Sequence, residues 1–382
     1  MGLSGRVDRV DAFPLSYSLD TAYGSARGTV AARTTTLVRL VTTDGVAGWG
    51  ECFGPPRVMA PLVEELSAPL IGQPVSDIEP FIAQSLQRAY HLSNGGLHVC
   101  ALSGLDIAMW DAWARTLDVS VSRLLGGRAR DVVRAYASTG YVTADLEVER
   151  FKESVLAAVE EGFTAVKVKI GLGLELDRPR AEATREAIGD AGILMVDFNA
   201  NCTADTARRI VDGISDLNIY WVEEPVPPED LEGYRSLRQL GIPIAAGEAL
   251  FTRYGFREII ASRLVDVVQP DVQKCGGLSE AKVIAHLART WNVRLAPHHW
   301  GGAVSQAATL QFLASIPDYP HTEHAPEPLW LEFDRAPNAL REDLPVEPIR
   351  ADGSYVEIPD GPGLGIELNE DAVQSLRLDK VG

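Results

Sequence analysis

Six side chains that can carry charge or bind a metal recur at a nearly constant interval through the middle of the sequence. Each stands at the end of a short apolar run, in the segments KVKIG, VDFNAN, WVEEP, AAGEAL, QPDVQ and APHHW. Their successive separations are 28, 26, 25, 23 and 27 residues, about one strand–helix unit each. Parallel strands joined in this way would bring all six groups to one rim of a barrel. The six residues are Lys169, Asp197, Glu223, Glu248, Asp271 and His298.

Three of these residues, Asp197, Glu223 and Glu248, are carboxylates on consecutive predicted strands. Carboxylate oxygens are hard ligands, and three of them leave coordination positions for water and substrate oxygens. This donor set favours octahedral Mg²⁺, or Mn²⁺, over zinc. The alternative is that each carboxylate only caps a loop. Three uncompensated charges placed so close together would be costly, which favours the metal site.

Two lysines, Lys167 and Lys169, lie on the same face of one predicted strand, because strand side chains alternate with a period of two. The valines and isoleucine between and after them indicate burial, although an exposed strand with solvated lysines would show the same alternation. A buried lysine beside a second cation is expected to have a lowered pKa and to act as a base near neutral pH. The pair is therefore a candidate for proton abstraction.

His298 and His299 are adjacent and point in different directions, so only one of them can be catalytic. Asp271, on the preceding strand, could hold His298 by a hydrogen bond, which would set the tautomer of the imidazole and raise its basicity. Asn199 lies two residues after the first carboxylate ligand, on the same face, and is a candidate contact for the substrate. Lys274 and the two glycines after Cys275 are expected to form the turn into the next helix.

The elements that must position these groups change in character near residue 130. The first part contains β-like runs at 29–41 and 46–51, joined at the turn signal Asp44-Gly45. Strands followed by consecutive helices predict a small α+β domain over residues 1–130. Its helices are expected at 58–70, 77–91 and 97–117.

After residue 130 short apolar runs alternate with amphipathic stretches. This order implies strand–helix–strand units and a parallel sheet, and the constant unit length favours a TIM-like (β/α) barrel over an open doubly wound sheet. We expect this barrel over residues 131–345, and a strand-like segment rich in Gly and Pro, 346–382, that packs back on the N-terminal domain. The expected strands are 132–137, 165–170, 193–198, 219–223, 243–247, 265–268 and 293–296.

Charge and composition exclude several classes of partner. The 35 basic and 53 acidic residues give a net charge of −18, so no basic face is available for nucleic acid. A bound cation and local lysines could still make a small pocket attractive to an anionic substrate. The four cysteines form no C-x-x-C pair, and neither a signal peptide nor an apolar run of about 18 residues is present, so we expect a cytoplasmic protein without membrane contact.

The motifs quoted above, together with the GWGE hairpin, the SGLDIAMWD helix and the IPDGPGLGIE tail, resemble the mandelate racemase and muconate lactonising enzyme group of the enolase superfamily. The Lys-x-Lys pair with the Asp–His pair is similar to its mandelate racemase branch. The segments PHHWGG and LEFDRAPNALRE look most similar to enzymes that cycloisomerise galactarolactone and to neighbouring sugar-acid dehydratases. The resemblance implies an N-terminal capping domain closing on a (β/α)₇β barrel, Mg²⁺, an enediolate intermediate and a homo-oligomer.

The resemblance also implies a role for each candidate site residue. The three carboxylates would bind the metal. Lys169, with Lys167 beside it, would act as a base on one face of the substrate, and His298, with its aspartate partner, would serve the opposite face. A glutamate from the eighth strand often hydrogen-bonds the substrate carboxylate in such enzymes. Strand spacing favours Glu323 for this role, whereas the local LEFD pattern favours Glu332.

Two bases on opposite faces of a small carboxylate substrate allow three outcomes after the α-proton is removed. The leading hypothesis is cycloisomerisation of an aldarolactone, followed by dehydration of an acid sugar and then by racemisation. The segment 17–33, with Tyr17, Tyr23 and Arg27, is expected to supply mobile cap contacts that choose among them, unless these are surface loop residues. The rival from a different class is a catalytically silent barrel that binds metal, which would need neither the lysines nor the histidine.

Overall fold

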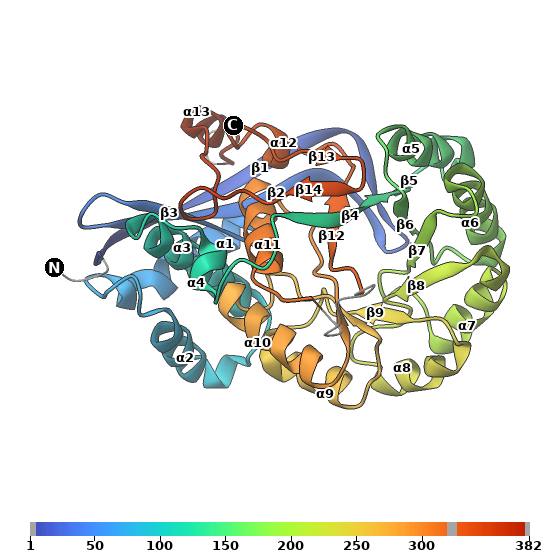
Figure 1. The fold of residues 1–382 in the computed structure, drawn as a ribbon, viewed down its shortest axis with the longest axis horizontal. Coiled ribbons are helices and arrows are strands. Elements are labelled where there is room, and N and C mark those ends of the chain that lie inside the picture. The colour runs from blue at the N-terminus through green and yellow to red at the C-terminus, as the bar shows by residue number, and fades with distance from the viewer. Residues whose placement is uncertain (1–4, 319–326, 379–382) are drawn as a thin grey trace.

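The computed structural model describes residues 5–318 and 327–378. A four-stranded antiparallel sheet covered by helices precedes a larger, mostly parallel sheet wrapped by helices (Figure 1). The predicted hairpin is confirmed, because β2 and β3 pair antiparallel on either side of Asp44-Gly45. The elements of this first part are β1 (Val7–Ser25), β2 (Gly28–Thr42), β3 (Ala47–Cys52), α1 (Pro56–Ser67), α2 (Ile78–Arg88), α3 (Leu97–Thr116) and α4 (Val121–Leu124).

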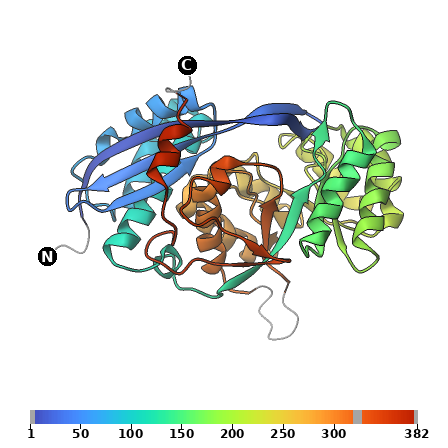
Figure 2. The same ribbon diagram turned by 90° about the horizontal axis from the view of Figure 1, so that it is seen from above.

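The long hairpin of β1 and β2 carries the capping sheet across the barrel, as Figure 2 shows. Its tip pairs with β5 (Val142–Thr143), which follows the first barrel strand. The segment 17–33 is therefore the tip of a paired hairpin. The sequence patterns do not predict β1, because Pro14, Gly24 and several polar residues interrupt its apolar alternation.

The strand β3 packs directly on α3, and its glycines permit the close approach. A Cβ atom at Gly50 would lie 1.9 Å from the carbonyl oxygen of Gly104, so only glycine fits this position of the GWGE motif. The helix α3 is buried on nearly every face, as its apolar sequence predicts. In the part of the chain that the structure describes, no helix is both long and apolar enough to cross a membrane.

In the residues that the structure describes, eight parallel strands and seven intervening helices form the predicted (β/α)₇β barrel. The strands follow the order β11-β10-β9-β8-β7-β6-β4, and β12 pairs with the other side of β4. All seven predicted strands are present. The elements are β4 (Val132–Thr139), α5 (Val148–Glu160), β6 (Ala165–Lys169), α6 (Leu174–Ile188), β7 (Ile193–Asp197), α7 (Ala204–Asp212), β8 (Ile219–Glu223), α8 (Leu231–Leu237), β9 (Ile244–Ala246), α9 (Thr252–Ala261), β10 (Val267–Val268), α10 (Gly277–Thr290), β11 (Arg294–Leu295), α11 (Ala303–Ala314) and β12 (Trp330–Asp334), followed by α12 (Ala339–Glu342).

A cluster of buried side chains fills the barrel interior, with one residue from each strand or its end. Tyr136 of β4 packs against Trp221 of β8 and Trp330 of β12, with ring centroids 5.6 and 6.2 Å apart. Because strands from both ends of the pairing order meet in one cluster, the sheet closes on itself. The interior residues are Tyr136, Ala165, Met195, Trp221, Ala245, Val267, Ala296 and Trp330.

The C-terminal segment contacts both the barrel and the capping domain. The strand β14 (Tyr355–Glu357) pairs with β13 (Ala351–Asp352) and with the barrel strand β4. Arg115 of α3 forms an ion pair with Glu367 at 2.6 Å. The segment ends in a helix, α13 (Glu370–Ser375), so the purely strand-like pattern expected for it is incomplete. The two boundaries between the three domains given above stay a prediction.

A buried carboxylate on α3, Asp106, joins the capping domain to the barrel helix α10 by accepting hydrogen bonds from the backbone N–H and the hydroxyl of Ser279. Burial raises the pKa of Asp106 to about 7. The folded protein therefore holds this proton more tightly than the unfolded chain does, and stability is lost as the pH rises from about 4 to about 7. The full shift corresponds to ~4 kcal/mol.

We predict that Asp106→Asn, which keeps one of the two accepting oxygens but cannot ionise, gains stability relative to the wild type as the pH is raised from about 5 to about 8. Denaturant unfolding at both pH values measures this difference. The exposed Asp20→Asn provides the control, because it removes a carboxylate that lies outside this contact. A difference for Asp106→Asn that is independent of pH would contradict the raised pKa.

Candidate active site

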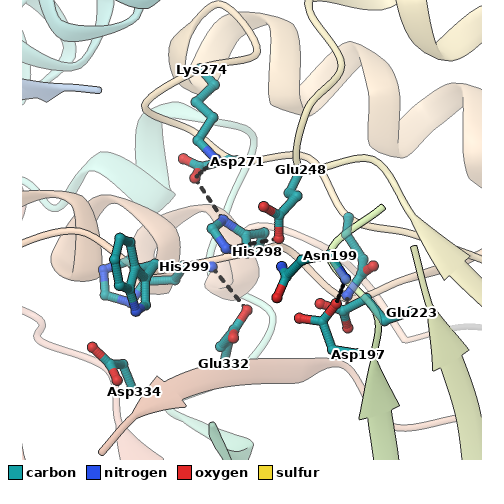
Figure 3. A network of polar contacts seen from close by, with 12 residues as sticks. Asp197, Asn199, Glu223, Glu248, Asp271, Lys274, His298, His299, Glu332 and Asp334 are labelled. Atoms are coloured by element: carbon teal, nitrogen blue, oxygen red, sulfur yellow. Dashed lines mark hydrogen bonds and ion pairs between the residues drawn. The ribbon is translucent and has the colours of Figure 1, made fainter. Parts of the chain in front are cut away.

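The structure brings all six predicted residues to the carboxyl ends of the barrel strands. Figure 3 labels Asp197, Glu223, Glu248, Asp271 and His298 among them. Lys169, Asp197 and Glu223 are the last residues of β6, β7 and β8. Glu248, Asp271 and His298 follow the shorter strands β9, β10 and β11 within three residues. The near-constant spacing places them together because each strand–helix unit of a barrel returns the chain to the same rim.

The three carboxylates converge as a metal site requires. One ligand oxygen from each of Asp197, Glu223 and Glu248 lies within 4.8 Å of the other two. Among the described residues, Glu248 Oε2 has no hydrogen-bond donor, although His298 Nε2 lies 3.1 Å away. Burial, together with the charge of Asp197, raises the pKa of Glu223 to about 7, against the effect of Lys167. A divalent cation fits this converging set of oxygens.

Both lysines of the predicted pair are buried and face the carboxylates. The ammonium of Lys167 contacts Glu223 and lies 2.8 Å from Glu332 Oε1. The ammonium of Lys169 lies 2.5 Å from Asp197 Oδ2. The valines and isoleucine of this strand point to the helices instead, so the reading of an exposed strand with solvated lysines is wrong.

The lowered pKa expected for Lys169 is also wrong in this structure. Burial lowers the pKa of Lys169, and so does Lys167, but the contact with Asp197 and the nearby charge of Glu248 outweigh them. The pKa is therefore raised above its ordinary value. The sequence pattern shows the second lysine on the same strand, but not the carboxylates that other strands supply.

His298 lies between a carboxylate that can orient it and one of the candidate metal ligands (Figure 3). Its Nδ1 forms the expected hydrogen bond with Asp271 Oδ2 at 2.7 Å, and its Nε2 lies 3.1 Å from Glu248. Burial lowers the pKa of His298, but Glu248 and the Asp271 hydrogen bond help to raise it overall. His299 points elsewhere, to the hydroxyl of Ser305 at 3.1 Å, and burial lowers its pKa to about 4.

Glu332 joins this site from the eighth barrel strand, β12. Its carboxylate is buried, contacts Lys167, and accepts a hydrogen bond from the backbone N–H of His299 at 3.3 Å. Burial raises the pKa of Glu332, but the charges of Lys167 and His298 lower it by more. The pKa is therefore below its ordinary value, and the carboxylate stays ionised. Glu323, the alternative from strand spacing, lies outside the described residues. The local LEFD pattern is therefore the sequence feature that indicates Glu332 at this site.

A cavity of about 860 Å³ opens above these residues and is lined by both parts of the molecule. The barrel contributes Lys169, Asn199 and His298, and the β1–β2 hairpin contributes Arg27. Arg27 also donates to the carbonyl oxygen of Ala200 at 3.2 Å. The other two predicted cap residues, Tyr17 and Tyr23, line a separate, smaller cavity.

A buried ionic network holds two aromatic residues of the cavity wall, Tyr141 and Trp300. Arg33 of the hairpin stacks on Trp300, 3.6 Å from the ring centroid, and pairs with Asp334 Oδ2 at 3.0 Å. The Tyr141 hydroxyl donates to Asp334 Oδ1 at 2.7 Å and accepts from Trp300 Nε1 at 3.1 Å. The capping domain thus fixes the wall beside His298.

Comparison with known proteins agrees with this architecture. Residues 150–372 match the family model for the enolase C-terminal domain-like region. Residues 17–126 match the model for the N-terminal domain of mandelate racemase and muconate lactonizing enzyme.

Relatives match over nearly the whole chain. The chain is 42% identical to D-galactarolactone cycloisomerase of Agrobacterium fabrum, over 95% of this chain and 97% of that protein. It is 30% identical to arabinonate dehydratase of Saccharolobus solfataricus, over 86% of this chain and 87% of that protein. The crystal structure of 3,6-anhydro-D-galactonate cycloisomerase from Zobellia galactanivorans superposes with a TM-score of 0.88 at 32% identity, over 97% and 99% of the two chains. The chain therefore belongs to the mandelate racemase and muconate lactonizing enzyme family of the enolase superfamily.

Proposed function

We propose that this protein is a magnesium-dependent cycloisomerase that removes the proton next to the carboxylate of an aldarolactone and opens the ring. The observation that carries the proposal is the placement of two buried basic groups at opposite ends of the carboxylate triad. Lys169 contacts Asp197, and His298 lies beside Glu248. A silent metal-binding barrel would need neither group, so this arrangement argues for proton transfer at both faces of a bound substrate.

Different residues would serve different roles in the first step, the removal of the α-proton. Mg²⁺ bound by Asp197, Glu223 and Glu248 would polarise the substrate carboxylate and lower the energy of the charge that develops on it. The buried ammonium of Lys167 would donate to the same carboxylate oxygens. One of the two bases takes the α-proton, and the C–H electron pair moves into the C=C bond of an enediolate.

Ring opening completes the proposed reaction. The bond from the β-carbon to the ring oxygen breaks with its electron pair, and the ring oxygen leaves as part of a new carboxylate. The remaining enol releases its O–H proton to solvent as its C–O bond becomes C=O, and its β-carbon receives a proton from the second side chain. The product is a linear keto acid with the same atoms as the lactone. His298 is placed to return this proton if Lys169 takes the first one, or the reverse.

Similarity to a galactarolactone cycloisomerase over 95% of the chain supports the lactone as substrate. A carboxylate is a better leaving group than hydroxide, so ring opening needs no added acid. Dehydration of a linear acid sugar is the second candidate, favoured by the similarity to an arabinonate dehydratase. It would require His298 or Lys169 to protonate the departing hydroxyl. A cytoplasmic location and a homo-oligomeric state stay predictions.

Lys169→Met and His298→Asn should each lower kcat for D-galactarolactone by about 10²–10⁴-fold, because that is the usual contribution of a positioned acid or base. Time-resolved ¹H NMR of the conversion measures the rate. Lys152→Met, which removes a lysine paired with Glu186 on the surface, is the control and should keep the wild-type rate. A variant of Lys169 or His298 with more than about a tenth of the wild-type rate would exclude that residue as a base.

Mg²⁺ at about 100 times its Kd should raise the free energy of unfolding by ~2.7 kcal/mol, because it binds only the folded protein. Thermal unfolding with and without Mg²⁺ measures the shift, and EDTA should reverse it. Glu248→Gln should abolish the shift, whereas Glu232→Gln, which alters an exposed carboxylate on α8, should keep it. A shift of wild-type size in Glu248→Gln would place the metal elsewhere.

A further inference from the structure

Two polar residues that the proposed chemistry does not use, Glu224 and Lys274, line the same cavity as the candidate bases. Both are buried, with 3% and 8% of their surfaces exposed. Lys274 lies beside Asp271, as Figure 3 shows, and lines the cavity. The expectation that Lys274 serves only as part of a turn is therefore incomplete, because its side chain faces the cavity.

Glu224 is held in a strained conformation with an unused acceptor. Its backbone φ is +40°, in the left-handed region, and the neighbouring Asn199 and Ala200 have φ of +46° and +56°. Such conformations are strained for residues other than glycine and persist at functional sites. Sheet hydrogen bonds fix Glu224, since its N–H donates to Ala245 and its carbonyl accepts from Ala200. Within the described residues, its buried Oε1 accepts no hydrogen bond, which points to a ligand as partner.

Lys274 offers the complementary group. Its ammonium lies 3.5 Å from Asp271 Oδ2, an oxygen that already pairs with His298, and 4.6 Å from the ring centroid of Phe53. These contacts leave N–H donors available to a ligand in the cavity. Burial lowers the pKa of Lys274, but Asp271 and nearby carboxylates that include Glu224 raise it overall, so the group stays charged.

We infer that Glu224 and Lys274 form a subsite that binds a hydroxyl group of the substrate, beyond the carbons that react. A hydroxyl both donates and accepts, so it can donate to Glu224 Oε1 while accepting from the Lys274 ammonium. The carboxyl of Glu224 has an accepting oxygen in either protonation state. The inference rests on the proposed function and narrows it, because the substrate must carry a hydroxyl on its lactone ring.

The test compares D-galactarolactone with its 2-deoxy and 3-deoxy ring analogues. A hydrogen bond to a charged group is worth about 1.5–3 kcal/mol, so the wild type should prefer the full lactone over one analogue by about 10–100-fold in kcat/KM. Glu224→Ala and Lys274→Met should each reduce this preference to within about 3-fold. Glu224→Gln keeps an accepting oxygen and should restore most of it, while the exposed Glu232→Ala should leave the preference unchanged.

Other outcomes would overturn the inference. If Glu224→Ala and Lys274→Met lowered kcat/KM equally for the lactone and both analogues, the two residues would have a structural role. Calorimetry measures the Kd for Mg²⁺ in Glu224→Ala and Lys274→Met. A Kd raised by about tenfold in either variant would show that the substitution acts through the metal site. If the wild type binds Mg²⁺ but converts none of the compounds and exchanges no α-proton in D₂O, the proposed function fails and the inference with it. Exchange and conversion with an unchanged preference in both variants overturn the inference alone.

Discussion

The compensation of buried charge at the barrel rim is the constraint on which the rest of this structure depends. Asp197, Glu223 and Glu332 are almost completely buried, and each contacts the ammonium of Lys167 or Lys169. A charge left unpaired in such surroundings costs several kcal/mol, so no member of the set can move independently. The barrel meets this constraint because its parallel strands present successive side chains at one rim. The same arrangement that satisfies the buried charges brings together the oxygens of the proposed metal site and the two proposed bases.

The capping domain extends this constraint beyond the barrel. The buried Glu51 of β3 accepts hydrogen bonds from the N–H groups of Gly302 and Ser305, at 2.7 and 2.9 Å, where α11 begins. Arg33 of the hairpin meets Asp334 at the end of β12. These contacts anchor the cap to the two segments that flank His298 and Glu332, so the cavity wall and the proposed catalytic residues are held together. Closure of this kind excludes water and strengthens the electrostatic effects inside the cavity.

The fold and the groups at the strand ends are predictable from the sequence because both depend on a repeated strand–helix unit. Features are not predictable where this unit changes length or where contacts come from distant segments. Fifteen residues separate α11 from β12, so Glu332 follows His298 by 34 residues, and spacing pointed to Glu323 instead. The pKa of Lys169 depends on carboxylates from other strands, which no local pattern contains. The long strand β1 was missed because its partner, not its own alternation, determines its conformation.

Exchange of the substrate α-proton with solvent tests the central claim most directly. The measurement is ¹H NMR of D-galactarolactone and a set of linear acid sugars in D₂O, with the enzyme and Mg²⁺. We expect that the α-proton of at least one of these compounds is lost to solvent, that deuterium enters the product, and that EDTA stops the process. Turnover in which the α-hydrogen stays on its carbon, or exchange that persists after complete removal of the metal, would contradict this expectation.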